Sequence, residues 1–156
     1  MQDIKDRGTL FRQNEIVFSN RKDVVFYNDS QTGLKTIIAI HNTNCRPAIG
    51  DCRFLPYVTE DEALQDVSRL SRAMTYKTAL ANLNIGGGKS VIIGEPEKIT
   101  TPELMKAFGC FIEKLNGMYI IGEDVGTSLE DMEQIHKVTK YVRGLKALVG
   151  VEIRLL

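Results

Sequence analysis

The sequence predicts an α/β fold, with a single domain in which a mixed β-sheet is covered by helices on both faces. Runs rich in β-branched and aromatic residues alternate along the chain with longer segments of helical periodicity. Several apolar runs are continuous, as in strands that are buried on both faces. The length of 156 residues suits one domain with a sizeable core, and no internal repeat or linker divides it.

The strand candidates begin near the N-terminus. EIVFSN (15–20) and DVVFYN (23–28) have the residue content of strands, and a turn-rich segment leads into the apolar run LKTIIAIH (34–41). A loop containing Pro47 and Gly50 is expected before DCRFLPY. Further along, SVIIG (90–94) and residues 118–121 indicate two more short strands.

Three helices are predicted from their first residues. Thr59 and Glu62 form a capping box, and apolar residues then recur at helical spacing to about Leu83. A threonine followed by proline begins a second helix over 101–117, which a glycine ends. A third helix begins at SLED (128–131).

The charge balance argues against several classes of partner. Lys+Arg and Asp+Glu number 20 each and alternate locally, so no basic surface points to nucleic acid or to anionic lipid. The N-terminal segment lacks the apolar core of a signal peptide, and no run is long enough to cross a bilayer. These features predict a cytoplasmic protein with no membrane and no nucleic-acid partner.

The cysteines and histidines do not predict a metal site. Cys45, Cys52 and Cys110 form no CxxC pair, and their odd number indicates no disulfide framework. His41 and His136 have no nearby residues at ligand spacing, which favours a structural role for both.

The segment GGGKS (86–90) is the clearest candidate for chemistry. Three adjacent glycines precede Lys89, namely Gly86, Gly87 and Gly88. A phosphate-binding loop would need glycine where Leu83 stands, and a dinucleotide fingerprint would need it where Val91 stands, so both nucleotide interpretations fail on spacing. The remaining alternatives are a flexible turn with a solvated Lys89, or a close approach of the backbone to another group.

The residues around Lys89 resemble a known family signature, and this resemblance favours a functional lysine over a solvated turn residue. Leu83, the glycines, Lys89, Val91 and Pro96 match the active-site signature of the glutamate/leucine/phenylalanine/valine dehydrogenases, although Glu95 departs from it. IAIHN, DEAL, LSRAMTYK, LNGMYI and GEDVGTS agree as well. Over residues 34–142 the chain resembles the substrate and dimerisation domain of this family, and most closely its leucine/phenylalanine branch.

The resemblance implies an activity and a set of site residues. Members oxidise an amino acid with NAD to an imine, which water converts to a 2-keto acid. Lys89 matches the catalytic lysine, and Asp124 matches the acid that moves protons between the substrate amine and water. The matching substrate-binding positions include one that pairs with the substrate carboxylate (Lys77), together with Met74, Gly50, Ile49 and Gly122.

Two of these positions suggest a side-chain preference. Ile49 matches an apolar wall of the substrate pocket, and Gly122 stands where leucine-preferring members usually have alanine. The missing methyl group would leave room, which predicts a bulky apolar or aromatic substrate. The expected partners are therefore such an amino acid, its 2-keto acid and further copies of the chain, since this domain carries the family's subunit contacts.

Two features depart from the family pattern. Arg46 and Asp51 replace glycines, and an added carboxylate at Asp51 would repel a substrate carboxylate or pair with Lys77. No GxGxxG occurs in the sequence, so residues 1–145 are interpreted as the substrate and dimerisation domain and 146–156 as a divergent tail, without a nucleotide-binding domain. NAD is implied only by the resemblance, and a separate nucleotide-binding subunit could supply its site.

Two functions therefore stay open at this stage. The first is the substrate-binding half of an amino-acid dehydrogenase, which alone is not expected to transfer hydride. The alternative is a non-catalytic oligomerisation or small-carboxylate-binding module derived from that family. Taken singly, Lys77, Lys89 and Asp124 could each be an ordinary helix or turn residue, and only their shared context favours the site.

Overall fold

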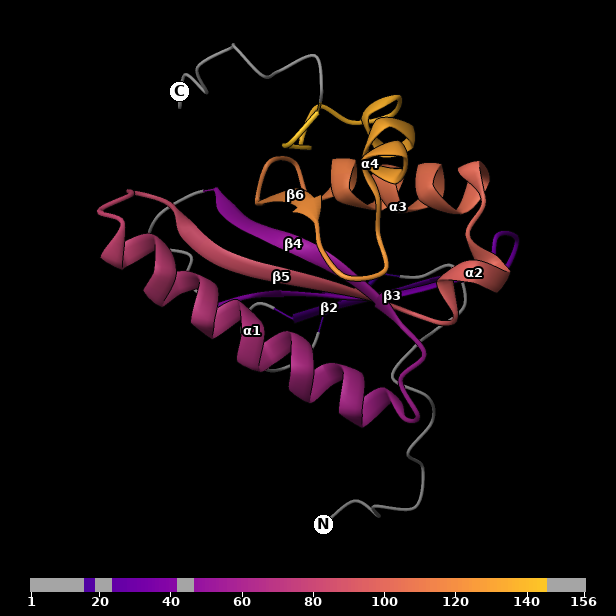
Figure 1. Cartoon of the computed structure of the whole chain (residues 1–156), viewed down its shortest axis with the longest axis horizontal. Helices are drawn as coiled ribbons and strands as arrows, with labels where there is room; N and C mark the ends of the chain where they lie inside the picture. Colours follow the sequence, from indigo (N-terminus) through magenta and orange to yellow (C-terminus); the bar gives the residue numbers. More distant parts are fainter. Residues whose placement is uncertain (1–15, 19–23, 42–46, 146–156) are drawn as a thin grey trace.

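The computed structural model describes residues 16–18, 24–41 and 47–145 (Figure 1). Within these ranges the chain forms one six-stranded sheet in the order β1-β2-β3-β5-β4-β6. The strands are β1 (Ile16–Phe18), β2 (Val24–Asp29), β3 (Leu34–Ile40), β4 (Ala48–Leu55), β5 (Gly86–Ile93) and β6 (Tyr119–Glu123). Neighbours from β1 to β5 are antiparallel, whereas β4 is parallel to both β5 and β6.

Helices cover the two faces of the sheet, as the sequence predicts. The described helices are α1 (Glu60–Leu80), α2 (Pro96–Ile99), α3 (Pro102–Lys114) and α4 (Leu129–His136). In Figure 1, α1 lies along one face, and α3 and α4 lie on the opposite side. None of the helices among the described residues has the length and apolar character that a membrane span requires.

Each face has its own apolar core. On one side, Ala63 and Val67 of α1 pack with Ile37 of β3 and Val91 of β5. The core on the other side is larger and includes buried residues of α3 and α4, such as Phe108. Strands β3 and β5 contribute to both cores, which explains why their apolar residues run without alternation.

The predicted helix starts are confirmed. Thr59 caps α1 by accepting a hydrogen bond from the Glu62 N–H at 3.1 Å, although the Glu62 carboxylate accepts from the Val58 N–H rather than from that of Thr59. Thr101 caps α3, and Ser128 begins α4 with a complete capping box. Helix α1 ends at Leu80, three residues before the expected end.

The two glycine-containing loops are corrected by the structure. Gly86–Gly88 are not a loop but the first three residues of β5, and they are buried. Gly50 likewise lies within β4 rather than before it. Glycine is required in β5 because α1 lies directly against the strand: a Cβ on Gly87 would fall 2.1 Å from the Thr75 backbone nitrogen.

Three of the earlier expectations lie outside the described residues. These are Arg46, Cys45 and the proposed tail at 146–156. The domain boundary at residue 145 therefore stays a prediction.

Candidate functional site

The site is organised around Lys89, which β5 projects from the α1 side of the sheet. Side chains alternate along the strand: Val91 packs against α1, whereas Ser90 lies on the other face and bonds the Tyr119 hydroxyl at 3.0 Å. Lys89 shares the face of Val91 and is only 4% exposed. Its Nζ donates to Asp124 Oδ2 at 2.6 Å, so the interpretation of Lys89 as a solvated turn residue is wrong.

Asp124 is positioned by the turn that follows β6. Its backbone N–H donates to Thr127 Oγ1 at 2.9 Å, and the Thr127 hydroxyl also lies 3.0 Å from the Cys52 carbonyl of β4. Arg53, on the same strand, donates from Nε to Asp124 Oδ2 at 3.2 Å. Strand β4 therefore holds both the backbone and the carboxylate of this turn.

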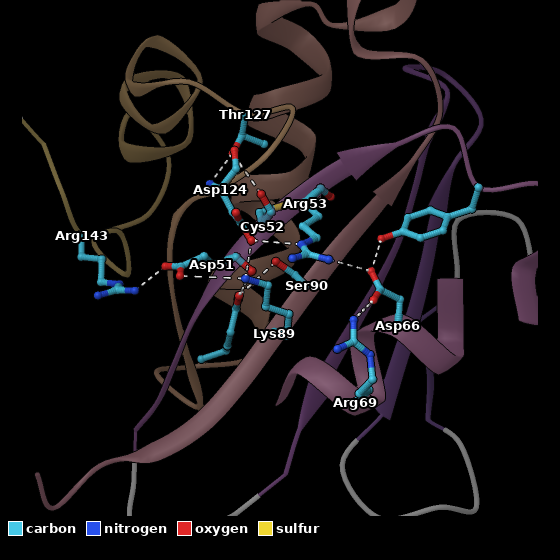
Figure 2. A network of polar contacts seen from close by, with 12 residues as sticks. Asp51, Cys52, Arg53, Asp66, Arg69, Lys89, Ser90, Asp124, Thr127 and Arg143 are labelled. Carbon is cyan, nitrogen blue, oxygen red and sulfur yellow. Dashed lines mark hydrogen bonds and ion pairs between the residues drawn. The ribbon is translucent and has the colours of Figure 1, made fainter. Parts of the chain in front are cut away.

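The contacts extend on both sides into a row of alternating charges, which Figure 2 shows. On one side Arg53 bridges to Asp66 of α1 at 3.2 Å, and Asp66 bonds Arg69 at 2.8 Å. On the other side Lys89 Nζ lies 3.9 Å from Asp51 Oδ2, and Asp51 Oδ1 pairs with Arg143. We call these residues the charge network: Arg69, Asp66, Arg53, Asp124, Lys89, Asp51 and Arg143.

The charge network carries an excess of positive charge. Among the described residues it joins four cations to three carboxylates. Its centre is shielded from water, since the Lys89 side chain is 5% exposed and that of Asp124 is 24% exposed. Partly buried charges are screened less than surface ones, so the charges at this centre act on one another more strongly than exposed ion pairs do.

The environment of Asp124 keeps it ionised. Burial alone raises the pKa of its carboxyl, but the hydrogen bonds from Lys89 and the Val125 backbone, and the nearby Lys89 and Arg53 cations, lower it by more. The net effect is a pKa below the ordinary value. Asp124 is therefore a carboxylate at neutral pH and can accept a proton when its bond to Lys89 is released.

This lowered pKa predicts a pH dependence of stability. Because the pKa is lower in the folded than in the unfolded chain, the stabilisation is present above the unfolded pKa of about 4 and is lost as the pH falls through the folded value. Asp124→Asn should lower the free energy of unfolding at neutral pH, and this difference from the native chain should shrink in acid. Urea titrations from neutral to acidic pH, with the exposed Glu133→Gln as control, check it; a difference that stays constant with pH would contradict it.

The other predicted site residues on the sheet lie close to the charge network. Gly50 lies directly against β5, since a Cβ on it would be 1.9 Å from the Gly88 carbonyl oxygen. Ile49 precedes it in β4 and is buried. Gly122 lies in β6 beside Asp51, because a Cβ on Gly122 would be 2.6 Å from Asp51 Oδ1. The structure therefore brings these residues together with Lys89 and Asp124.

The two predicted residues on α1 are less closely tied to the site. Met74 is half-buried, and Lys77 is exposed in the last turn. The contact of Thr75 with Gly87 places this end of α1 against the start of β5, two residues before Lys89. Within the described part of the chain no hydrogen bond or ion pair holds the Lys77 ammonium group, so its role as a carboxylate ligand stays a prediction.

The expected partner of Asp51 is wrong. Its carboxylate pairs with Arg143 and faces Lys89, rather than pairing with Lys77. The reason is the strand geometry, because Asp51 is flanked by β5 on one side and β6 on the other, and α1 contacts β4 only weakly.

Several residues of the charge network were not predicted from the sequence. Arg53 could have been found, since it stands two residues after Asp51 in a strand and therefore shares its face. Asp66 is one acid among several on α1, and Arg143 lies 92 residues from Asp51, so nothing local in the sequence marks either as a partner.

Other candidate chemistry near the site does not hold. Burial raises the pKa of the Cys52 thiol to about 12, so it stays protonated at neutral pH. Among the described residues, no three His, Cys, Asp or Glu side chains are grouped as a metal ion would require. His41 is exposed just beyond β3, with Nδ1 at 3.1 Å from Thr75 Oγ1.

Comparisons with known proteins agree with this geometry. Residues 16–141 match the family described as Glu/Leu/Phe/Val dehydrogenase, dimerisation domain. The phenylalanine dehydrogenase of Caldalkalibacillus thermarum is 55% identical over 132 residues, which are 85% of this chain and 36% of that protein. The leucine dehydrogenase of Bacillus subtilis is 52% identical over 129 residues, which are 83% of this chain and 35% of that protein.

A solved structure supports the same relationship. The L-tryptophan dehydrogenase from Nostoc punctiforme superposes with a TM-score of 0.75 and 48% sequence identity, covering 78% of this chain and 36% of that one. The chain thus spans about a third of the length of the relatives that it matches. It belongs to the Glu/Leu/Phe/Val dehydrogenase family, of which it represents the dimerisation domain.

Proposed function

We propose that this chain is the substrate-binding half of an NAD-dependent dehydrogenase, which converts an apolar L-amino acid, aliphatic or aromatic, to its 2-keto acid. The observation that carries the proposal is the ion pair of the buried Lys89 with the half-buried Asp124, at 2.6 Å. Membership of the family and about 50% identity to leucine and phenylalanine dehydrogenases support both the reaction and the substrate class.

The residues of the site suit the proton transfers of this reaction. Oxidation removes a hydride from Cα and a proton from the substrate nitrogen, and water then adds to the carbon while ammonia leaves. Asp124 is ionised, so it takes a proton from the substrate ammonium and releases it to solvent before the hydride leaves. It later takes a proton from the attacking water and returns it to the nitrogen that departs as ammonia. Lys89 donates a hydrogen bond to the developing oxygen, and the positive excess of the charge network favours a bound carboxylate.

The cofactor is not assigned to the described residues. NAD would accept the hydride, but a dinucleotide is bound at a glycine-rich turn between a strand and a helix. The three adjacent glycines lie within the buried strand β5, where Gly87 faces Thr75 and Gly88 faces Tyr119. The described residues therefore do not fit the pyrophosphate.

Self-association forms part of the proposal. The matching family region is described as a dimerisation domain, which supports a homo-oligomer, a dimer or larger.

A chimera tests the proposed reaction. The chain is fused to the nucleotide-binding part of the Bacillus subtilis leucine dehydrogenase, in place of that enzyme's own matching third. We expect NAD reduction with L-leucine or L-phenylalanine and none with L-glutamate. The same fusion joint carrying the enzyme's own N-terminal part is the control.

The proposal would be contradicted if the chimera folded but did not reduce NAD while the control fusion did. That outcome would favour the second candidate, a carboxylate-binding module without catalysis. One observation argues against catalysis specifically: the Asp51 carboxylate lies 3.9 Å from Lys89 Nζ, so it competes with Asp124 for the ammonium group.

A further inference from the structure

The space beside Gly122 is already filled by the protein itself. A Cβ added to Gly122 would lie 2.6 Å from Asp51 Oδ1 and 2.9 Å from Arg143 Nε. Both distances are too short for a real contact, so even alanine would not fit without displacing the pair. The room that the glycine leaves is therefore occupied by an ion pair.

Backbone hydrogen bonds position Arg143 beside Gly122. Its N–H donates to the Ile121 carbonyl at 2.8 Å, and the Ile121 N–H donates to the Tyr141 carbonyl at 3.0 Å. Residues 141–143 thus run parallel to the edge of β6, bridged through Val142, and set the Arg143 side chain next to Gly122. The guanidinium position follows from regular pairing rather than from a free surface side chain.

Asp51 is held from two sides. Oδ1 pairs with Arg143, and Oδ2 faces Lys89 at 3.9 Å. The Asp51 side chain is 23% exposed and that of Arg143 is 36% exposed, so the pair is partly withdrawn from water. Turning either side chain away would separate partly buried opposite charges, which opposes opening of this space to a ligand.

We propose that Asp51 and Arg143 form a specificity-determining pair, which fills the side-chain pocket at Gly122 and restricts the substrate to short aliphatic side chains. This inference rests on the proposed function and narrows it, because aromatic side chains are excluded while the pair is intact. The pair acts by volume: a ring that reached Gly122 would overlap the carboxylate or the guanidinium. A glycine at position 122 then leaves room for the Asp51–Arg143 pair and not for a bulky substrate side chain.

Ligand binding to the chain itself tests the proposal. Dissociation constants are measured by NMR titration with 3-methyl-2-oxobutanoate, which has a short branched side chain, and with phenylpyruvate. We expect the native chain to favour the short acid by about tenfold or more. Arg143→Ala and the double variant Asp51→Gly/Arg143→Ala should lower this ratio by about tenfold, through tighter binding of phenylpyruvate.

Two control variants separate volume from charge. Asp51→Asn keeps the size of the side chain and an amide oxygen that can accept a hydrogen bond from Arg143, so it should keep most of the preference for the short acid. Lys140→Ala removes a cation from the same segment, where it lies over the Tyr141 ring, and should also leave the ratio unchanged. Amide spectra of each variant establish that it is folded before titration. Arg143→Ala keeps the backbone N–H that donates to the Ile121 carbonyl, so we expect it to fold.

The outcomes distinguish the two proposals. If both acids bind and the ratio of their dissociation constants is the same in every variant, the pair does not determine specificity. The proposed function would be unaffected by that result. An equal change in Asp51→Asn and in the double variant would assign the effect to charge and would also overturn the pair as a specificity element. No binding of either acid to any folded variant would overturn the carboxylate-binding function, and this inference with it.

Discussion

Replacing Gly50 with alanine is expected to unfold the sheet around the candidate site. The new methyl group would lie 1.9 Å from the Gly88 carbonyl oxygen and 2.9 Å from the Lys89 nitrogen. Both are backbone atoms of β5, and they cannot retreat without breaking the parallel pairing that joins Ile49 to Gly87 and Cys52 to Ser90. We expect a loss above about 4 kcal/mol in the free energy of unfolding, measured by urea denaturation followed by circular dichroism.

A second glycine provides the matched control. A Cβ on Gly33 meets nothing within 4 Å, but the residue has φ +76. Gly33→Ala therefore reports the backbone strain alone, which is about 1–2 kcal/mol. Similar losses in the two variants would show that β4 and β5 can separate at Gly50 and that the close approach is not needed for the fold.

Removing the Lys89 ammonium should abolish most of the activity of the chimera. In Lys89→Ala, Asp124 keeps Arg53 as its cationic partner but loses the adjacent group that donates at 2.6 Å. We expect kcat/KM for the preferred amino acid to fall by about 10²–10⁴-fold, the usual contribution of a positioned acid–base group. The fall should lie mainly in kcat, since the group acts on the reacting atoms.

Two further variants sharpen this result. Lys89→Arg keeps the charge but replaces a compact ammonium by a planar guanidinium, so it should not restore the rate. Lys98→Ala removes an exposed lysine that pairs with Glu95 and should leave the rate unchanged. If kcat/KM of the Lys89→Ala chimera lay within about tenfold of that of the parent chimera, Lys89 would not act on the reacting atoms.

The parts of the fold that sequence reasoning recovered are those with local signals. Thr59 and Ser128 accept from the backbone three residues later, so a few neighbouring letters suffice to predict where α1 and α4 begin. The strand β3 could also be predicted from its continuous apolar run, because both of its faces are buried. The end of α1 was less so, since Leu80 and Leu83 are both exposed and neither marks a boundary by burial.

The glycine run illustrates a conflict between local and tertiary information. Adjacent glycines favour turns, and by propensity Gly86–Gly88 should not form a strand. They do form a strand, and at Gly87 and Gly88 the reason is that Thr75 of α1 and Tyr119 of β6 lie where side chains would otherwise stand. Only the packed structure contains that information, because it depends on elements that are distant in the sequence.

The candidate site divides in the same way. Lys89 and Asp124 were found through motifs that surround each of them, and the structure brings them into contact. The partners of Asp51 could not be found, since its charge is shared between β5 and a segment near the end of the described chain. Strand order decided the pairing, and strand order is a property of the whole sheet.

The charge network also bears on the order in which the molecule folds. Its contacts span 13 residues for Arg53 with Asp66, 35 for Lys89 with Asp124 and 92 for Asp51 with Arg143. Closing a longer loop loses more chain entropy, and an ion pair alone returns too little free energy to drive such closure. We therefore expect the apolar layers to assemble before these ion pairs form, so that the site is completed late in folding. Partly folded chains would contain the same lysines and aspartates without the ion pairs between them. Ligand recognition is therefore expected only of the fully folded protein.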